Sequence, residues 1–200
     1  FAANHPNTMM DPLIVGANCN RRVSILARST LFSNKVYAWL LGLIGIIPVY
    51  RKIDAKSDMV RNEDMFAATY RHLEKGHALL IFPEGKSTPE RIIHQVKTGA
   101  ARIGLGAEAS NDFKLNVQLV PAGINYSAGT KFRSDVHCRF GRPIAMKDFM
   151  DQYEADDRSA VQAVTTQLQQ ALKKLTTTLK DETDADIVQS LEMIYKKELT

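Results

Sequence analysis

Apolar and polar positions along this chain alternate in blocks that predict strands and helices in turn. Short apolar segments predict strands at 22–28, 46–50, 77–82, 115–124 and 136–140, the fourth of them broken by Pro121. Helices are predicted at 33–43, 57–75, 97–109, 157–179 and 185–198. Strands that alternate with helices are typical of an α/β fold, with a mixed, mostly parallel sheet flanked by helices. We expect this domain at 1–150 and a C-terminal helical extension at 151–200.

The strand predicted at 77–82 is the most informative segment of this pattern. Its sequence, HALLIF, is apolar throughout and lacks the alternation of a half-exposed strand. Such a run is typical of a strand that is covered on both faces. Polar motifs stand where the predicted strands end and where helices begin, and ligands of α/β sheets bind at strand ends. The chemistry of the chain is therefore expected there.

Composition places the chain among soluble globular domains. Its 200 residues are 44% hydrophobic and 24% charged, which is enough apolar material for a real core. The net charge of +4 is compatible with anionic lipid, a phosphorylated substrate or nucleic acid, and selects none of them. No basic–aromatic cluster marks a nucleic-acid surface, so no nucleic-acid partner is expected. Cys19 and Cys138 lack metal-ligand or redox spacing and are expected to be reduced thiols.

The longest apolar run, at 36–49, reads VYAWLLGLIGIIPV and is too short for a bilayer-spanning helix, which needs about 20 residues. A buried helix end followed by a buried strand fits the run, because two glycines and Pro48 interrupt it. A membrane-dipping patch that carries Trp39 is the alternative. The chain shows no signal peptide and starts at Phe1, directly before a motif. We therefore expect a fragment whose native N-terminus is missing, together with any membrane helix upstream.

The first motif with candidate chemistry is NHPNTMMDP at 4–12. On a continuous helix, the six steps from His5 to Asp11 turn the chain by roughly 600°, which places the two side chains on different faces. Pro6 disfavours helical geometry at His5. A helix cap at Asn7 or Thr8 then bends the loop and brings His5 over Asp11. A carboxylate bonded to one imidazole nitrogen makes the other a base for a hydroxyl proton. In the alternative, the histidine merely caps a helix and the carboxylate faces solvent.

The second motif is FPEGKST at 82–88, directly after the apolar strand. Its proline ends the strand, and Gly85 permits a tight turn with exposed backbone N–H groups. Because Lys86 and Ser87 add a cation and a hydroxyl, an oxyanion or a phosphate is an expected guest. An ordinary strand-to-loop turn is the alternative. A P-loop is excluded, because that motif needs an earlier glycine where this chain has Leu80.

Other residues carry less information. Arg51 and Lys52 end a predicted strand and, taken singly, are typical of a solvated surface. No pair of histidines has zinc-ligand spacing with a third donor, so no metal site is expected. No serine lies in a nucleophile-elbow pattern, which argues against a Ser-His-Asp hydrolase.

The order of these motifs is more specific than any one of them. The blocks NHPNTMMD, GIIPVYR, FPEGKST and VPAGI occur in the order of the four blocks of the phospholipid/glycerol acyltransferase superfamily. The chain resembles this superfamily, also called PlsC-like, over roughly residues 1–145. KTGAARIG at 97–104 resembles the helix between its third and fourth blocks, and FGRPI at 140–144 resembles the strand exit that follows.

The resemblance implies transfer of a fatty acyl group from acyl-CoA or acyl carrier protein to a hydroxyl of glycerol-3-phosphate or lysophosphatidate. The setting that it implies is phospholipid biosynthesis at the cytoplasmic face of a membrane. By this resemblance His5 is the general base and Asp11 orients it. The implied substrate-binding residues are Asn7, Arg51, Glu84, Gly85, Lys86 and Ser87. The acyl donor is a co-substrate, and no cofactor is expected.

Two departures from the family pattern bear on the substrate. Five residues separate His5 from Asp11, where the commonest pattern has four. The longer form is similar to that of yeast-type glycerol-3-phosphate acyltransferases and favours a first-acylation enzyme. Many members have an arginine where this chain has Ser87, and Lys86 lacks the bidentate fork of an arginine. Two alternatives stay open: a non-catalytic lipid- or acyl-CoA-binding domain of the same fold, and an acyltransferase for a non-phosphorylated acceptor.

Overall fold

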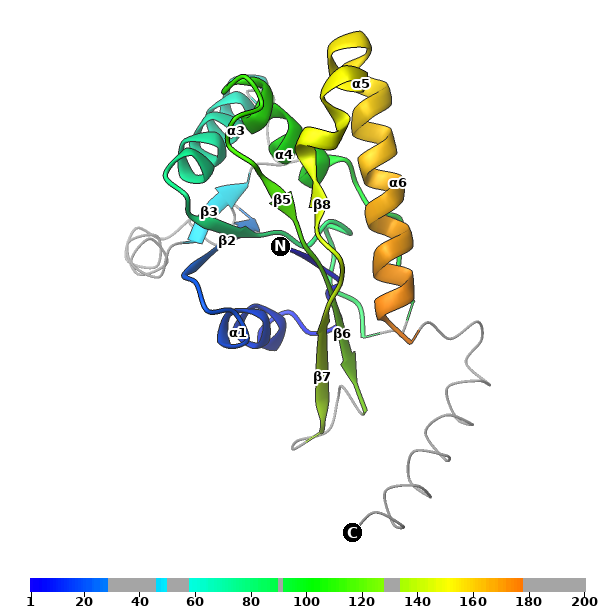
Figure 1. Cartoon of the computed structure of the whole chain (residues 1–200). Coiled ribbons are helices and arrows are strands. Elements are labelled where there is room, and N and C mark those ends of the chain that lie inside the picture. Colours follow the sequence, from blue (N-terminus) through cyan, green and yellow to red (C-terminus); the bar gives the residue numbers. More distant parts are fainter. Residues whose placement is uncertain (29–45, 50–57, 90–91, 128–133, 178–200) are drawn as a thin grey trace.

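The structure is a computed structural model, and it describes residues 1–28, 46–49, 58–89, 92–127 and 134–177 (Figure 1). The helices predicted at 33–43 and 185–198 lie outside these ranges, as do Trp39, Arg51 and Lys52. Within the described ranges, no helix has both the length and the apolar character needed to cross a bilayer.

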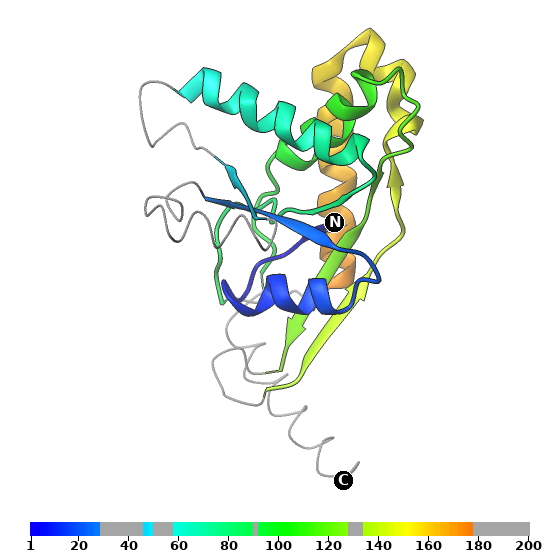
Figure 2. The ribbon, with the colours of Figure 1, turned by 90° about the vertical axis from the view of Figure 1, so that its left-hand side faces the viewer.

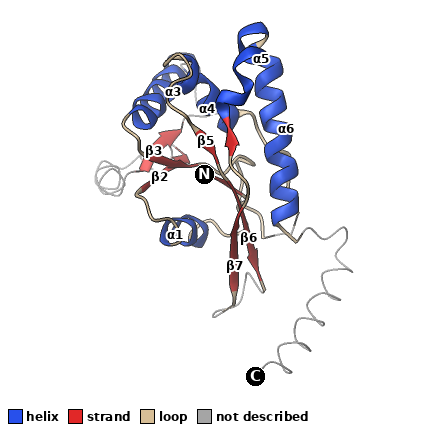
Figure 3. Cartoon of the chain, viewed as in Figure 1, coloured by secondary structure: helices blue, strands red, loops and turns tan. Residues whose placement is uncertain are grey.

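A mixed sheet forms the centre of the molecule (Figures 1 and 3). Its strands are β1 (Ala2–Ala3), β2 (Val23–Arg28), β3 (Ile46–Val49), β4 (Ala78–Leu80), β6 (Pro121–Tyr126) and β7 (Val136–Phe140). The ladders β3-β2-β4 and β1-β6-β7 join where the Ile81 N–H donates to Phe1 at 3.0 Å and the Ala3 N–H donates to Ile81 at 3.1 Å. All these neighbours are parallel except β6 and β7. The predicted mixed, mostly parallel sheet is confirmed.

The strand predicted at 115–124 forms as two short strands. β5 (Gln118–Leu119) pairs antiparallel with β8 (Ile144–Ala145), and β6 begins at Pro121. Proline has no N–H to donate and is tolerated as the first residue of a strand, which explains the interruption at this point.

Helices cover both faces of the sheet (Figures 1 and 2). They are α1 (Met10–Ala17), α3 (Asp58–Glu74), α4 (Gly99–Ala109), α5 (Met150–Ala155) and α6 (Asp157–Leu175), with a 3-10 turn η2 (Met146–Phe149) before α5. On the α1 face, Val15 packs with Leu80 and Ile124. On the opposite face, Leu79 packs with Ile103 of α4. Because successive strand residues point to opposite faces, the apolar strand predicted at 77–82 is covered on both sides.

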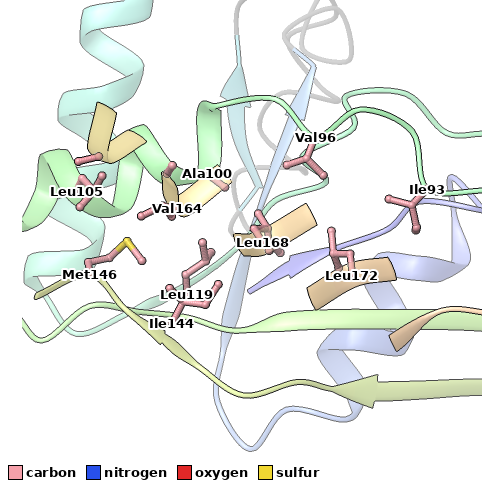
Figure 4. Close-up of a cluster of buried hydrophobic side chains, with 13 residues drawn as sticks. Ile93, Val96, Ala100, Leu105, Leu119, Ile144, Met146, Val164, Leu168 and Leu172 are labelled. Atoms are coloured by element: carbon pink, nitrogen blue, oxygen red, sulfur yellow. The ribbon is translucent and has the colours of Figure 1, made fainter. Parts of the chain in front are cut away.

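The largest buried cluster lies between α4, α6 and the sheet (Figure 4). From α6 it includes Val164, Leu168 and Leu172, which recur every four residues and share one side of the helix. The end of α6 lies directly on β6, since a Cβ atom added to Gly123 would lie 2.6 Å from Leu175 Cβ. This glycine is therefore required by close packing, and α6 is a part of the main core.

Most predicted elements form with shifted ends. The segments predicted as helices at 57–75 and 97–109 are α3 and α4. The helix predicted from residue 157 begins there, because the Asp156 carboxylate accepts the Arg158 N–H at 3.1 Å, and it ends at Leu175. The sequence pattern does not predict β8, η2 or α5. The division into 1–150 and 151–200 stays a prediction.

Candidate active site

The two sequence motifs meet because β1 and the end of β4 are neighbours in the sheet. His5 follows β1 and Phe82 follows β4, and their rings stack with centroids 3.8 Å apart and planes inclined by 14°. The Thr88 N–H also donates to the His5 carbonyl oxygen at 3.1 Å. The segment after β4 therefore holds this histidine both by its ring and by its backbone.

Asp11 lies in the first turn of α1 and is completely buried, at 0% exposure. Its Oδ2 atom lies 2.8 Å from His5 Nδ1 and accepts the Asn7 N–H at 2.8 Å. The Asn7 side-chain oxygen accepts the N–H groups of Met9 and Met10 at 3.2 and 3.1 Å. This capped loop lets the chain turn within the five-residue spacing, and Asp11 does not face solvent.

Tyr126 is a member of the site that sequence reasoning missed. Its hydroxyl donates to Asp11 Oδ1 at 2.7 Å from the last residue of β6. Burial raises the pKa of the Tyr126 phenol above its usual value, and the hydrogen bond to Asp11 raises that pKa further, so the phenol keeps its proton. The signal available in the sequence was a tyrosine two residues after the VPAGI block, at the end of a strand.

This arrangement fixes which imidazole nitrogen can act as a base. An ionised carboxylate only accepts hydrogen bonds, so His5 Nδ1 is the donor to Asp11 and Nε2 is the nitrogen that can take up a proton. The His5 side chain is 14% exposed while the Asp11 side chain is fully covered. The site thus has a buried carboxylate that orients a partly accessible imidazole, which is the geometry that general-base chemistry requires.

The loop after β4 is shaped by a buried glutamate and a glycine. The Glu84 carboxylate is 5% exposed and accepts the backbone N–H of His94 at 2.9 Å. Gly85 has a φ of 70°, in the left-handed region that favours glycine. Lys86 is exposed and Ser87 is partly buried. These contacts give Glu84 and Gly85 a role in the shape of the loop, and the predicted substrate contacts of the loop stay predictions.

His94, to which the sequence assigned no role, ties the far end of this loop to the site. Its Nε2 atom lies 3.0 Å from the Thr88 hydroxyl, and the Thr88 backbone in turn donates to His5. Because Glu84 also accepts the His94 N–H, the loop closes on itself beside the dyad.

A cavity of about 300 Å³ lies between the ends of β6, β7 and α6. Pro6, which follows His5 in the chain, lines this cavity. The lining also includes Tyr126, Ile92, Ile124 and the cation Arg139. Within the described ranges, no cluster of three or more His, Cys, Asp or Glu side chains could hold a metal ion. Arg51, which was predicted together with Lys86 as a substrate-binding cation, lies outside those ranges.

The fold is that of an α/β protein, and its His–Asp pair lies at the carboxyl edge of a mostly parallel sheet, where such proteins bind their ligands. The chain belongs to the acyltransferase family, whose model, described as Acyltransferase, matches residues 1–125. It is 30% identical over 134 residues to Glycerol-3-phosphate O-acyltransferase 1 of Saccharomyces cerevisiae, which covers 66% of this chain and 18% of that protein. It is 27% identical over 141 residues to Glycerol-3-phosphate O-acyltransferase 2 of the same yeast, covering 70% and 19%.

An uncharacterized acyltransferase of Schizosaccharomyces pombe is 30% identical over 128 residues, covering 63% of this chain and 19% of that protein. The chain thus matches less than a fifth of the length of these curated relatives. Among solved structures, the 1-acyl-sn-glycerophosphate acyltransferase PlsC of Thermotoga maritima is similar, with a TM-score of 0.52 and 20% identity. The match covers 86% of this chain and 65% of PlsC, and it confirms the PlsC-like fold.

Proposed function

We propose that the protein transfers a fatty acyl group from acyl-CoA or acyl carrier protein to a hydroxyl of a glycerol phosphate. The observation that carries this proposal is the contact of 2.8 Å between His5 Nδ1 and the buried Asp11 carboxylate. It leaves Nε2 as the acceptor for the proton of an alcohol. An alcohol is a poor nucleophile until a base removes that proton.

In the proposed step, the acceptor oxygen attacks the thioester carbonyl carbon while its proton moves to His5 Nε2. The tetrahedral intermediate collapses, the C–S bond breaks, and the thiolate leaves with the proton returned from the imidazolium. The products are an ester and a free thiol. Asp11 stabilises the imidazolium that forms and holds its orientation. A thioester already has a good leaving group, so no covalent enzyme intermediate is required.

The acceptor that we propose first is glycerol-3-phosphate, with lysophosphatidate second. The five-residue spacing between His5 and Asp11 and the similarity to two yeast proteins named glycerol-3-phosphate O-acyltransferases support this order. Lys86, on the loop bonded to His5, and Arg51 are the proposed partners of the phosphate. Asn7, Glu84, Gly85 and Ser87 complete the proposed acceptor site.

The proposed setting is phospholipid biosynthesis at the cytoplasmic face of a membrane, because the acyl chains of donor and product are membrane-soluble. No cofactor enters this mechanism. An acyltransferase for a non-phosphorylated acceptor is a second candidate, because Ser87 replaces the arginine found in many family members.

The test is an acyl-transfer assay with glycerol-3-phosphate, lysophosphatidate and glycerol side by side, each with acyl-CoA and with acyl carrier protein as donor. We expect transfer to glycerol-3-phosphate above all. Equal rates on glycerol and glycerol-3-phosphate would favour the second candidate. Binding of acyl-CoA without turnover on any acceptor would contradict both and would support a non-catalytic binding domain.

A further inference from the structure

Helix α1, which carries Asp11, exposes large apolar side chains on its outer side. Met9 is 76% exposed, Leu13 is 61% exposed and Met10 is 44% exposed. These are three of the six large hydrophobic side chains that are exposed in the described part of the chain, and they fall within five consecutive residues. Met10 and Leu13 are three residues apart and share one side of the helix, and Met9 is the residue directly before its first turn. We call these three side chains the α1 apolar face; such a group is unlike the scattered single exposures of ordinary surfaces.

The internal packing of the protein does not use this face. Of the α1 side chains, only Val15 belongs to a buried hydrophobic cluster. The one charged side chain of α1, Asp11, is buried against His5 and Tyr126. An ordinary surface helix exposes its charged side chains and buries its apolar ones. Helix α1 differs, because its carboxylate is buried while Met10 and Leu13 are exposed.

The chain segment that contains α1 is basic in composition. Residues 1–53 contain six Lys and Arg against one acid, the buried Asp11, whereas residues 54–200 contain twenty Lys and Arg against twenty-one acids. Exposed Arg22 follows α1 closely in the chain, and exposed Lys86 lies on the loop that bonds to His5. Exposed apolar side chains on a helix in a basic segment are the pattern of helices that lie in the interface of anionic membranes.

We propose that the α1 apolar face docks the protein on a lipid bilayer that carries anionic headgroups. Met9, Met10 and Leu13 enter the boundary of the acyl chains, and Arg22 contacts a headgroup phosphate. Docking then brings the dyad to the membrane surface, because Asp11 lies on the same helix. The inference rests on the proposed function in one respect, namely that long-chain substrate reaches the site from the membrane.

The experiment is co-sedimentation of the 200-residue chain with vesicles of phosphatidylcholine plus phosphatidic acid, and with vesicles of phosphatidylcholine alone. The double variant Met9→Gln, Leu13→Gln should lower the partition coefficient by about tenfold or more, since each side chain loses apolar area inserted in lipid. Arg22→Gln should lower it by about fivefold on anionic vesicles only. Phe140→Gln is the matched control, because Phe140 is 39% exposed on β7 and lies outside this face. It should leave binding unchanged.

Unchanged partition of the double variant, an equal loss in Phe140→Gln, or equal binding to vesicles without phosphatidic acid would each overturn the proposal. Light scattering tests a second possible occupant of the α1 apolar face, which is another copy of the chain. The face is assigned to that copy if the wild type is a dimer, the double variant is a monomer, and vesicle binding is intact in the double variant. With glycerol-3-phosphate and a short-chain acyl-CoA in solution, the double variant should keep its rate within about twofold. If wild type binds vesicles as expected but transfers no acyl group, the proposed function fails and the docking surface stands.

Discussion

The hydrogen bond from Tyr126 to Asp11 gives the sharpest test of how the site is held together. Tyr126→Phe removes only the phenol oxygen, which lies 2.7 Å from Asp11 Oδ1. A hydrogen bond to a charged group contributes about 1.5–3 kcal/mol to stability. Because Asp11 is 0% exposed, water does not readily replace the lost donor. For a chain of this size, that loss lowers the melting temperature by about 3–12 °C.

The same variant should change the pH dependence of the reaction. Asp11 keeps two donors on Oδ2, from His5 and from the Asn7 N–H, so it stays directed at the imidazole. Without the phenol, its negative charge is less dispersed and stabilises the protonated imidazole more strongly. We therefore expect the acid limb of the kcat/KM profile to move to higher pH and kcat/KM at neutral pH to fall by about tenfold. KM for glycerol-3-phosphate should stay within about twofold.

The matched control is Tyr153→Phe, which removes a phenol on α5. The Tyr153 ring packs against Phe113, with centroids 6.0 Å apart, in a part of the core remote from the dyad. The assay compares melting curves and pH–rate profiles of the wild type and the two variants. Identical acid limbs in all three proteins would refute the view that Tyr126 acts on the dyad through Asp11.

Three further predictions concern stability. The pKa of Tyr126 is raised by burial and then by its bond to the carboxylate. The protonated phenol therefore makes its full contribution to the free energy of unfolding below about pH 10, and this contribution is lost as pH rises through the pKa of the folded state. Urea titrations should thus show a steeper alkaline loss in wild type than in Tyr126→Phe. Gly123→Ala places a methyl group 2.6 Å from the Leu175 side chain and should cost about 1–3 kcal/mol in denaturant unfolding. Gly16→Ala adds a methyl group that has no atom within 4 Å and should gain up to about 1 kcal/mol of stability. Equal costs in the two variants would contradict the close packing of α6 on Gly123. Glu84→Gln should cost about 1–2 kcal/mol and speed proteolysis of the loop that its buried carboxylate holds, and unaltered cleavage would count against that contact.

The sheet and the main core could be predicted because buried segments carry strong local patterns. The apolar run at 77–82 predicts a strand covered on both faces, and Leu79 and Leu80 serve those two faces. The spacing of Val164, Leu168 and Leu172 likewise predicts the side of α6 that packs on the core. Such periodicity depends only on neighbouring positions, so it can be read without knowledge of the fold.

The contacts that complete the site could not be read in this way. Tyr126 meets Asp11 across 115 positions of sequence, through a strand pairing that no local pattern reports. Gly123 is fixed by the arrival of the end of α6, and its sequence context indicates only a strand break. The hydrogen bond from the His94 backbone N–H to the motif residue Glu84 likewise joins two positions ten residues apart, through a loop without a periodic pattern. Tertiary packing, rather than propensity, decides each of these.

The central claim is that His5, held by Asp11, removes the proton from an acceptor hydroxyl during acyl transfer. The most direct measurement is the rate of transfer from labelled acyl-CoA to glycerol-3-phosphate by wild type, His5→Ala and Asp11→Asn, below their melting temperatures and with circular dichroism spectra recorded for each. We expect transfer by wild type and losses of about 10³- to 10⁴-fold in both folded variants. Transfer at the wild-type rate by either folded variant would contradict it.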